Sequence, residues 1–134
     1  MDKDSKMIVI SGITKGLGRA LAEEYLKLGH LVIGCGRSIK LVGNFSEIAQ
    51  SNADFQVVDI SDYKQVLSWS EYVQNKFGSP DFLLNNAGVI NKNAVLWDVP
   101  EQEFSNVIDI NIKGVYNTIK QFVPSMIKNG KGIV

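Results

Sequence analysis

The chain has 134 residues, 45% of them hydrophobic, which is enough for one domain with a core of ordinary size. Lysine plus arginine and aspartate plus glutamate number 14 each, so the formal net charge is zero and neither a nucleic-acid nor a membrane partner is predicted. The single cysteine, Cys35, lies in an apolar run and is expected in the core. Residues 1–6 are polar and the apolar segment after them is too short for a signal or a membrane span, so we expect a cytoplasmic location.

Short apolar runs alternate with helical patterns along the chain. A buried strand is predicted at residues 7–10 and further strands at residues 31–33, 55–58 and 81–84, and residues 132–134 are expected to begin a fifth strand. The second run is expected to end at residues 34–37, which contain two glycines.

Helices are predicted between the strands from apolar residues that recur at helical spacing. Two stripes at helical spacing carry this prediction, each followed by a glycine: Leu17, Leu21, Tyr25 and Leu28 before Gly29, and Val66, Ser70, Val73 and Phe77 before Gly78. Ser61 or Asp62 can cap the second of these helices, and residues 40–52 remain ambiguous, with a short helix as one interpretation. A long helix is expected from about Pro100 to about Asn129, kinked near Pro124.

This alternation predicts an α/β fold: a Rossmann-type, doubly wound parallel sheet forming one domain over residues 1–134, truncated at the start of the fifth strand. Such sheets bind ligands at the carboxyl ends of their strands. The unusual sequence falls there, namely the glycine turn after the first strand, Arg37 after the second, Asp59 after the third and residues 85–88 after the fourth.

The first strand runs into a glycine-rich turn, Ser-Gly-Ile-Thr-Lys-Gly-Leu-Gly over residues 11–18, at the start of a helix. Backbone N–H groups at such a helix N-terminus bind a pyrophosphate, so the turn, with Thr14 and Leu17 in it, is a predicted dinucleotide site. Gly12 permits the tight turn, Gly16 lets the backbone approach the ligand, and Gly18 permits close helix–strand packing. An ATP loop is not indicated, because no Gly-Lys-Ser/Thr follows.

Taken in this order, four motifs resemble the short-chain dehydrogenases/reductases: Gly-x-x-x-Gly-x-Gly at residues 12–18, Asp59, Asn-Asn-Ala-Gly at residues 85–88, and Asn111 in the long helix. Residues 29–38 and 86–93 further resemble the NADPH-dependent pterin aldehyde reductases of plants. The resemblance implies reduction of a small carbonyl, with a pterin aldehyde as one candidate. It also implies that the family's serine and Tyr-x-x-x-Lys would lie beyond Val134, so the chain is expected to be an N-terminal fragment that is inactive alone.

The choice of cofactor can be read from the end of the second strand. NAD-dependent folds place a carboxylate about twenty residues beyond the glycines, to hold the ribose 2′-hydroxyl. Here that place holds Arg37 and Ser38, and Lys15 adds a second cation in the glycine turn. We expect Lys15 and Arg37 to bind the 2′-phosphate of NADP, although both can also be ordinary solvated charges.

The resemblance assigns further cofactor contacts after the third and fourth strands. Asp59 and the Ile60 backbone should meet the adenine, while Asn86, Ala87 and Gly88 should line the adenosine and ribose. Two plainer interpretations stay open: Asp59 can be a helix cap, and Asn-Ala-Gly can be a turn that ends a strand.

The resemblance gives Asn111 a catalytic role, in which it bends its helix and holds a water that links the catalytic lysine to solvent. The alternative is an asparagine bonded to its own helix backbone. The helix around Asn111 is also where the family usually assembles, which makes a homo-oligomer a candidate.

Tyr-x-x-x-Lys occurs twice in the chain, at Tyr72/Lys76 and Tyr116/Lys120. Both pairs precede the position where the catalytic pair should fall, so we interpret them as ordinary helical neighbours.

The remaining candidates carry no chemistry. His30, the only histidine, has no cysteine or carboxylate cluster around it in sequence, so no metal site is predicted. Trp69 and Trp97 are expected to be packing anchors, and Trp97 can alternatively border a substrate cleft.

Two alternatives to an NADP(H)-dependent reductase remain. The chain can be a non-catalytic nucleotide-binding module that pairs with full-length subunits, or a fragment with no function of its own. A methyltransferase or a GTPase fits less well, since neither accounts for Lys15, Arg37 and Asn-Asn-Ala-Gly together.

Overall fold

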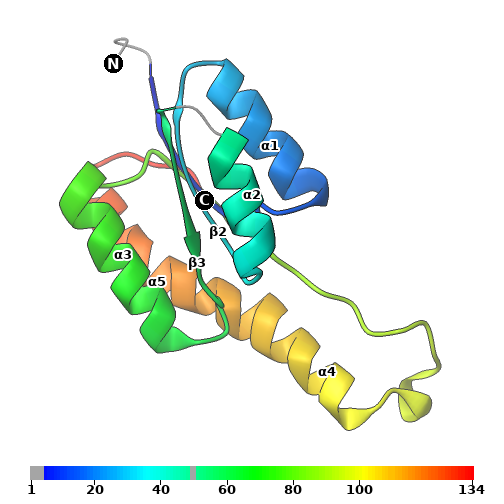
Figure 1. Ribbon diagram of the computed structural model, residues 1–134. Helices are drawn as coiled ribbons and strands as arrows, with labels where there is room; N and C mark the ends of the chain where they lie inside the picture. Colours follow the sequence, from blue (N-terminus) through cyan, green and yellow to red (C-terminus); the bar gives the residue numbers. More distant parts are fainter. Residues whose placement is uncertain (1–4, 49–50) are drawn as a thin grey trace.

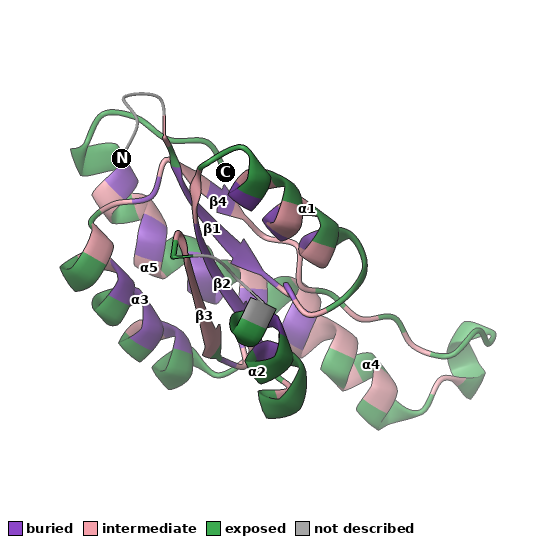
Figure 2. Cartoon of the chain, turned by 45° about the horizontal axis from the view of Figure 1, so that its top comes forward, coloured by how far each residue is buried: buried purple, intermediate pink, exposed green. Residues whose placement is uncertain are grey.

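A computed structural model describes residues 5–48 and 51–134 (Figure 1). It contains one parallel sheet with the strand order β3-β2-β1-β4 (Figure 2). Its strands are β1 (Met7–Ser11), β2 (Leu31–Gly36), β3 (Ala53–Val57) and β4 (Phe82–Leu84). Val9 in β1 is in register with Ile33 of β2 and Leu83 of β4. All neighbouring pairs run parallel, as right-handed crossovers require.

Helices cover both faces of this sheet. They are α1 (Gly16–Lys27), α2 (Ile39–Ile48), α3 (Tyr63–Phe77), α4 (Glu101–Ile108) and α5 (Val115–Lys128), with a short 3₁₀ turn at Leu96–Asp98 and a π-helical segment at Asp109–Gly114. Figures 1 and 2 show α1 and α2 on one face and α3 and α5 on the other. The chain therefore has the predicted Rossmann-type, doubly wound α/β fold.

The sheet separates two apolar cores, because successive side chains of a strand point to opposite faces. Ile8 and Ile10 of β1 pack with Ala22 of α1 and Phe45 of α2. On the opposite face, the core joins β1 to α3 and α5 through residues that are almost fully buried, including Val9, Val66, Trp69, Leu83 and Phe122. Trp69 lies edge-on to Phe122, with the ring centroids 5.2 Å apart, which confirms it as a packing anchor.

Helix α1 is present where the apolar spacing predicted it, but its buried face does not include every residue of the predicted stripe. Leu17 and Leu28 are 70% and 62% exposed, and the buried face of α1 consists of Gly18, Ala22 and Leu26. Leu17 lies in the first turn and Leu28 at the C-terminal cap, so neither faces the sheet.

Strand β2 ends at Gly36, within the predicted residues 34–37, and Gly34 lies inside the strand. A Cβ on Gly34 would lie 2.7 Å from Cγ2 of Ile13 and 3.0 Å from the Phe55 ring. This glycine therefore permits close packing inside the strand rather than a turn.

The long helix is present in three consecutive pieces. α4 begins immediately after Pro100, the π segment follows without a break, and α5 continues through Pro124 to Lys128. A helix is also present in the ambiguous stretch 40–52, of which residues 49–50 lie outside the described residues. Trp97 is 84% exposed in the 3₁₀ turn, so the prediction that it anchors packing was wrong.

The C-terminal residues lie beside β4. Ile133 forms a parallel bridge with Phe82, and its backbone exchanges hydrogen bonds with Asp81 and Leu83. Ile133 therefore pairs with β4 on the side that faces away from β1. Among the described residues, no helix combines the length and apolar character needed to span a bilayer.

Candidate functional site

A pocket of about 470 Å³ opens at the carboxyl ends of the strands. The sequence-predicted cofactor residues other than Gly18 all line it: Gly12, Thr14, Lys15, Gly16, Leu17, Arg37, Ser38, Asp59, Ile60, Asn86, Ala87 and Gly88. Residues separated by more than seventy positions in the chain therefore meet at one site, as the topology of a parallel sheet requires.

The glycine turn is fixed by backbone contacts to β2. The N–H groups of Gly12 and Ile13 both donate to the carbonyl oxygen of Cys35, at 2.8 and 3.1 Å. Gly12 has φ +78°, and a Cβ there would lie 2.8 Å from the Cα of Ala87. Only glycine fits here, because the glycine turn passes directly against the segment that follows β4.

The other two glycines of the motif differ in role. Gly16 has φ +58° and its Cβ position faces open space, which leaves the backbone accessible to a ligand. A Cβ on Gly18 would overlap the carbonyl oxygen of Gly12 and the side-chain amide of Asn86. The close packing predicted for Gly18 is therefore present, but against the glycine turn and Asn86 rather than against a strand.

The N-terminus of α1 has unused hydrogen-bond donors. Lys15 occupies the N-cap position, and its side chain caps no N–H group of the first turn. Those N–H groups carry the positive end of the helix dipole, and Lys15, Gly16 and Leu17 line the pocket. This region fits a pyrophosphate, because Gly16 has no side chain to block the approach of a ligand to the N–H groups of the first helical turn.

Asn86 holds the turn together rather than pointing freely into the pocket. Its Nδ2 atom donates to the carbonyl oxygens of Ser11 and Gly12, each at 3.0 Å, and the next N–H, of Ala87, donates to the Ser11 hydroxyl at 3.1 Å. Asn-Ala-Gly is thus more than a strand-ending turn, because it positions the glycine turn opposite it.

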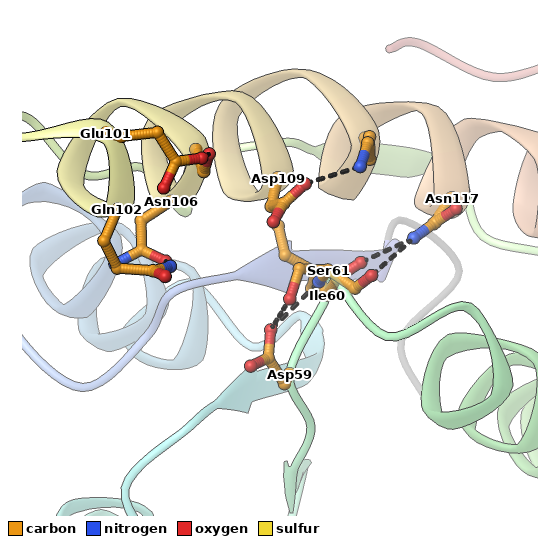
Figure 3. Close-up of polar contacts among 10 residues, drawn as sticks. Asp59, Ile60, Ser61, Glu101, Gln102, Asn106, Asp109 and Asn117 are labelled. Carbon is orange, nitrogen blue, oxygen red and sulfur yellow. Dashed lines mark hydrogen bonds and ion pairs between the residues drawn. The ribbon is translucent and has the colours of Figure 1, made fainter.

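Asp59 shapes the loop between β3 and α3 without capping α3. Its Oδ1 atom accepts from the N–H and the hydroxyl of Ser61, at 2.9 and 2.7 Å (Figure 3). The cap is Asp62, which accepts from the N–H groups of Lys64 and Gln65. These hydrogen bonds, from Gln65 first, hold the pKa of Asp62 below its usual value.

Two cations border the pocket. Arg37 and Lys15 are exposed, and within residues 5–48 and 51–134 neither forms an ion pair. Ser38 accepts from the N–H of Leu41 at 3.3 Å and so begins α2 beside Arg37. This arrangement offers two charges to an anionic group at the edge of the pocket.

Asn111 lies in the π segment and pairs with the loop after β4. Its Oδ1 accepts from the N–H of Val89 at 2.9 Å and its Nδ2 donates to the carbonyl oxygen of Val89 at 2.8 Å. An asparagine bonded to its own helix backbone is therefore the wrong interpretation. Asn111 does not itself line the pocket, whereas its neighbour Ile110 and its partner Val89 do.

Neither Tyr-x-x-x-Lys pair lines this pocket. Tyr72 and Lys76 form a surface cluster with Asp54, in which the Tyr72 hydroxyl and the Lys76 ammonium lie 2.7 and 3.0 Å from Oδ2 of that carboxylate. Burial raises the pKa of Asp54, but hydrogen bonds from Gln56, Tyr72 and Lys76 more than offset it, so the pKa is below its usual value.

Sequence reasoning missed six further residues of the pocket: Cys35, Gly36, Leu41, Val58, Val89 and Ile110. The sequence gives a weak indication for Ile110, since it precedes Asn111 in a helix that the motif places near the site. The sequence gives no indication for Cys35, because its contribution to the glycine turn comes from its backbone. Burial raises the pKa of the Cys35 thiol to about 12, which disfavours the thiolate form.

Comparison with known proteins agrees with this geometry. The family model for short chain dehydrogenases matches residues 6–134, and the chain belongs to that family. It is 42% identical over 132 residues to the NADPH-dependent pterin aldehyde reductase of Arabidopsis thaliana, covering 97% of this chain and 54% of that protein. It is also 32% identical over 127 residues to a 3-oxoacyl-[acyl-carrier-protein] reductase of Haemophilus influenzae, covering 95% of this chain and 52% of that one.

Solved structures give the same result. A short-chain dehydrogenase from Streptomyces avermitilis superposes with a TM-score of 0.90 at 25% identity, over 99% of this chain and 49% of that one. A 3-ketoacyl-(acyl-carrier-protein) reductase from Brucella melitensis complexed with NADH gives a TM-score of 0.88 at 29% identity, over 93% of this chain and 52% of that one. The chain spans about half the length of the relatives it matches.

Proposed function

We propose that the pocket binds NADP(H) and that the chain is the cofactor-binding part of a reductase acting on a small carbonyl compound. The observation that carries the proposal is the gathering of the glycine turn, the uncapped N-terminus of α1 and two cations around one pocket. Similarity to an NADPH-dependent relative supports the choice of cofactor.

Each part of the cofactor has residues suited to it. The N–H groups around Lys15, Gly16 and Leu17 would hold the pyrophosphate. Arg37 and Lys15 would hold the 2′-phosphate, and the loop that contains Asp59 would border the adenine. When bound, the reduced nicotinamide supplies a hydride for reduction of a carbonyl to an alcohol.

The substrate proposal rests on the relative of Arabidopsis thaliana, whose name specifies a pterin aldehyde. A pterin aldehyde is therefore our first candidate, and we expect the complete protein to act in the cytoplasm. The chain of 134 residues should not turn substrate over alone, since both of its Tyr-x-x-x-Lys pairs lie away from the pocket.

Fluorescence titration with NADPH and NADH tests the cofactor proposal. Because Arg37 and Lys15 are exposed, solvent screens them, and we expect about ten-fold tighter binding of NADPH. Arg37→Ala should remove most of that preference, whereas Lys40→Ala, an exposed cation of α2 outside the pocket, should not. Equal affinity of the unaltered chain for both nucleotides would contradict the proposal.

A turnover assay with NADPH and aldehydes tests the remaining claim. We expect oxidation of NADPH at the background rate when only the 134-residue chain is present. A rate above background that depends on aldehyde would show that the catalytic groups are already contained in this chain.

A second function, pairing with another subunit, is favoured by an exposed apolar stripe along α4, the π segment and α5. Its members are Phe104, Ile112, Tyr116, Ile119 and Ile127, with exposed fractions between 38% and 74%. Apolar surface of this extent is typical of interaction sites. Co-purification with a longer homologue, or self-association in sedimentation, would support this function, and a monomer that captures neither would contradict it.

A further inference from the structure

Asn117 is a buried polar residue that contacts the pocket only indirectly. It lies in α5 with 4% of its surface exposed, and its Nδ2 atom donates to the carbonyl oxygen of Ile60 at 2.8 Å. The same atom lies 3.5 Å from the carbonyl oxygen of Ser61, and Figure 3 shows the amide directed at both. A buried amide that crosses from a helix to a distant loop fixes the two elements relative to each other.

Gly114 makes a second contact with the same loop from the end of the π segment. A Cβ on Gly114 would lie 2.6 and 2.7 Å from Cδ1 and Cγ1 of Ile60. The helix can therefore approach Ile60 this closely only because position 114 has no side chain. Ile60 is itself buried and lines the pocket. The end of the π segment therefore packs against a residue of the pocket wall.

The loop of residues 59–61, here called the adenine loop, has its own local bonds. Asp59 accepts from Ser61, and these contacts set the shape of the loop. They do not set its position relative to the opposite side of the pocket. Among the side-chain hydrogen bonds of the described residues, those that join this loop to a distant segment come from Asn117 of α5, 57 positions after Ile60.

We propose that Asn117 is a positioning residue for the adenine half of the cofactor. It holds the adenine loop at the distance from the glycine turn that an adenine requires, and it touches no ligand itself. This inference rests on the proposed function, since it presupposes that the pocket binds the adenine half of NADP(H).

Hydrogen exchange on the ligand-free chain is the first test. Asn117→Leu keeps the volume of the side chain but removes the donor, and should accelerate exchange at residues 60–62 by at least about five-fold relative to α1. Gly114→Ala, which displaces Ile60 without removing a hydrogen bond, should have the same local effect. The control is Thr118→Val, which removes the neighbouring hydrogen bond to Asn85 and should leave residues 60–62 unchanged.

Binding of 2′,5′-ADP and of nicotinamide mononucleotide is the second test. Asn117→Leu should weaken 2′,5′-ADP about ten-fold and leave the mononucleotide unaltered, a split that general loss of stability would not produce. Unchanged exchange at residues 60–62 would overturn the positioning role whether or not any nucleotide binds. Faster exchange with unaltered affinity for 2′,5′-ADP would overturn its link to the cofactor, and failure of the unaltered chain to bind 2′,5′-ADP would contradict the proposed function itself.

Discussion

Gly18 and Gly43 are both helical glycines, but their surroundings differ. The position of a Cβ on Gly18 is occupied by the carbonyl oxygen of Gly12 and the amide of Asn86, whereas nothing lies within 4 Å of that position on Gly43. At Gly18 the absence of a side chain brings three segments of the site together. At Gly43 the glycine only costs helix stability.

These surroundings predict opposite effects of the same substitution. Gly18→Ala should lower the free energy of unfolding by about 1–3 kcal/mol, because the methyl group forces the glycine turn or Asn86 to move. Gly43→Ala should raise it by up to about 1 kcal/mol. Urea unfolding of both variants checks this, and equal effects would show that the turn does not need Gly18.

Residue roles that depend on backbone contacts could not be predicted from sequence. The motif spacing correctly placed Gly12, Asp59 and Asn86 at one pocket, since strand ends meet in a parallel sheet. It could not indicate that Asn111 pairs with the backbone of Val89, because any residue at that position offers the same N–H and carbonyl groups. The contact of Asn117 with Ile60 was missed for the same reason.

At the scale of elements, Asp81 joins three segments at the amino end of the sheet. Its Oδ2 accepts from the N–H of Met7 at the start of β1, and its Oδ1 accepts from the Lys131 ammonium at 2.8 Å. Burial raises the pKa of Asp81, but these two donors more than offset it and the pKa lies below its usual value. The ionised form of Asp81 is therefore more stable, relative to the protonated form, in the folded chain than in the unfolded chain.

This pKa shift predicts how stability depends on pH. A carboxylate whose pKa is lower in the folded chain than in the unfolded chain stabilises the folded state at pH values above its unfolded pKa of about 3.9. This stabilisation is lost as the pH falls through the lower pKa of the folded state. Asp81→Ala should lower the free energy of unfolding by about 1 kcal/mol at pH 6, a modest value because Lys131 is exposed. The difference in this free energy between the variant and the unaltered chain should become smaller below about pH 4.

Urea unfolding between pH 6 and pH 3 measures this difference, with Asp98→Ala, at an exposed position, as the control. If the difference in free energy of unfolding between Asp81→Ala and the unaltered chain stays constant down to pH 3, the ionised carboxylate is not the cause of that difference.

Element prediction succeeded where the apolar pattern was unambiguous. The four strands were placed within a few residues, because each contains a short apolar run, although β3 is only half-buried. Strand β2 ends at Gly36, inside the predicted residues 34–37, and the close approach of Ile13 and Phe55 explains why a glycine lies at position 34 within the strand. Leu17 matched the apolar period of α1, but a first-turn residue of this helix faces the pocket.

At the scale of the whole molecule, the sheet places one pocket where its central strands end. β1 lies between β2 and β4, so the turn after β1 is bordered by the loops that follow both neighbours. Crossovers on opposite faces open a crevice between those loops, and the residues predicted to bind the cofactor, other than Gly18, line it. The relatives share this half of the fold and extend for about as many residues again.

We propose that this crevice holds the adenine dinucleotide with its 2′-phosphate between Lys15 and Arg37. The most direct measurement is a crystal structure of the chain grown with a saturating concentration of NADP⁺. We predict density for the pyrophosphate at the N-terminus of α1 and for the 2′-phosphate within hydrogen-bond distance of Arg37. Density for the nucleotide elsewhere on the molecule, or a 2′-phosphate directed away from both cations, would contradict the account.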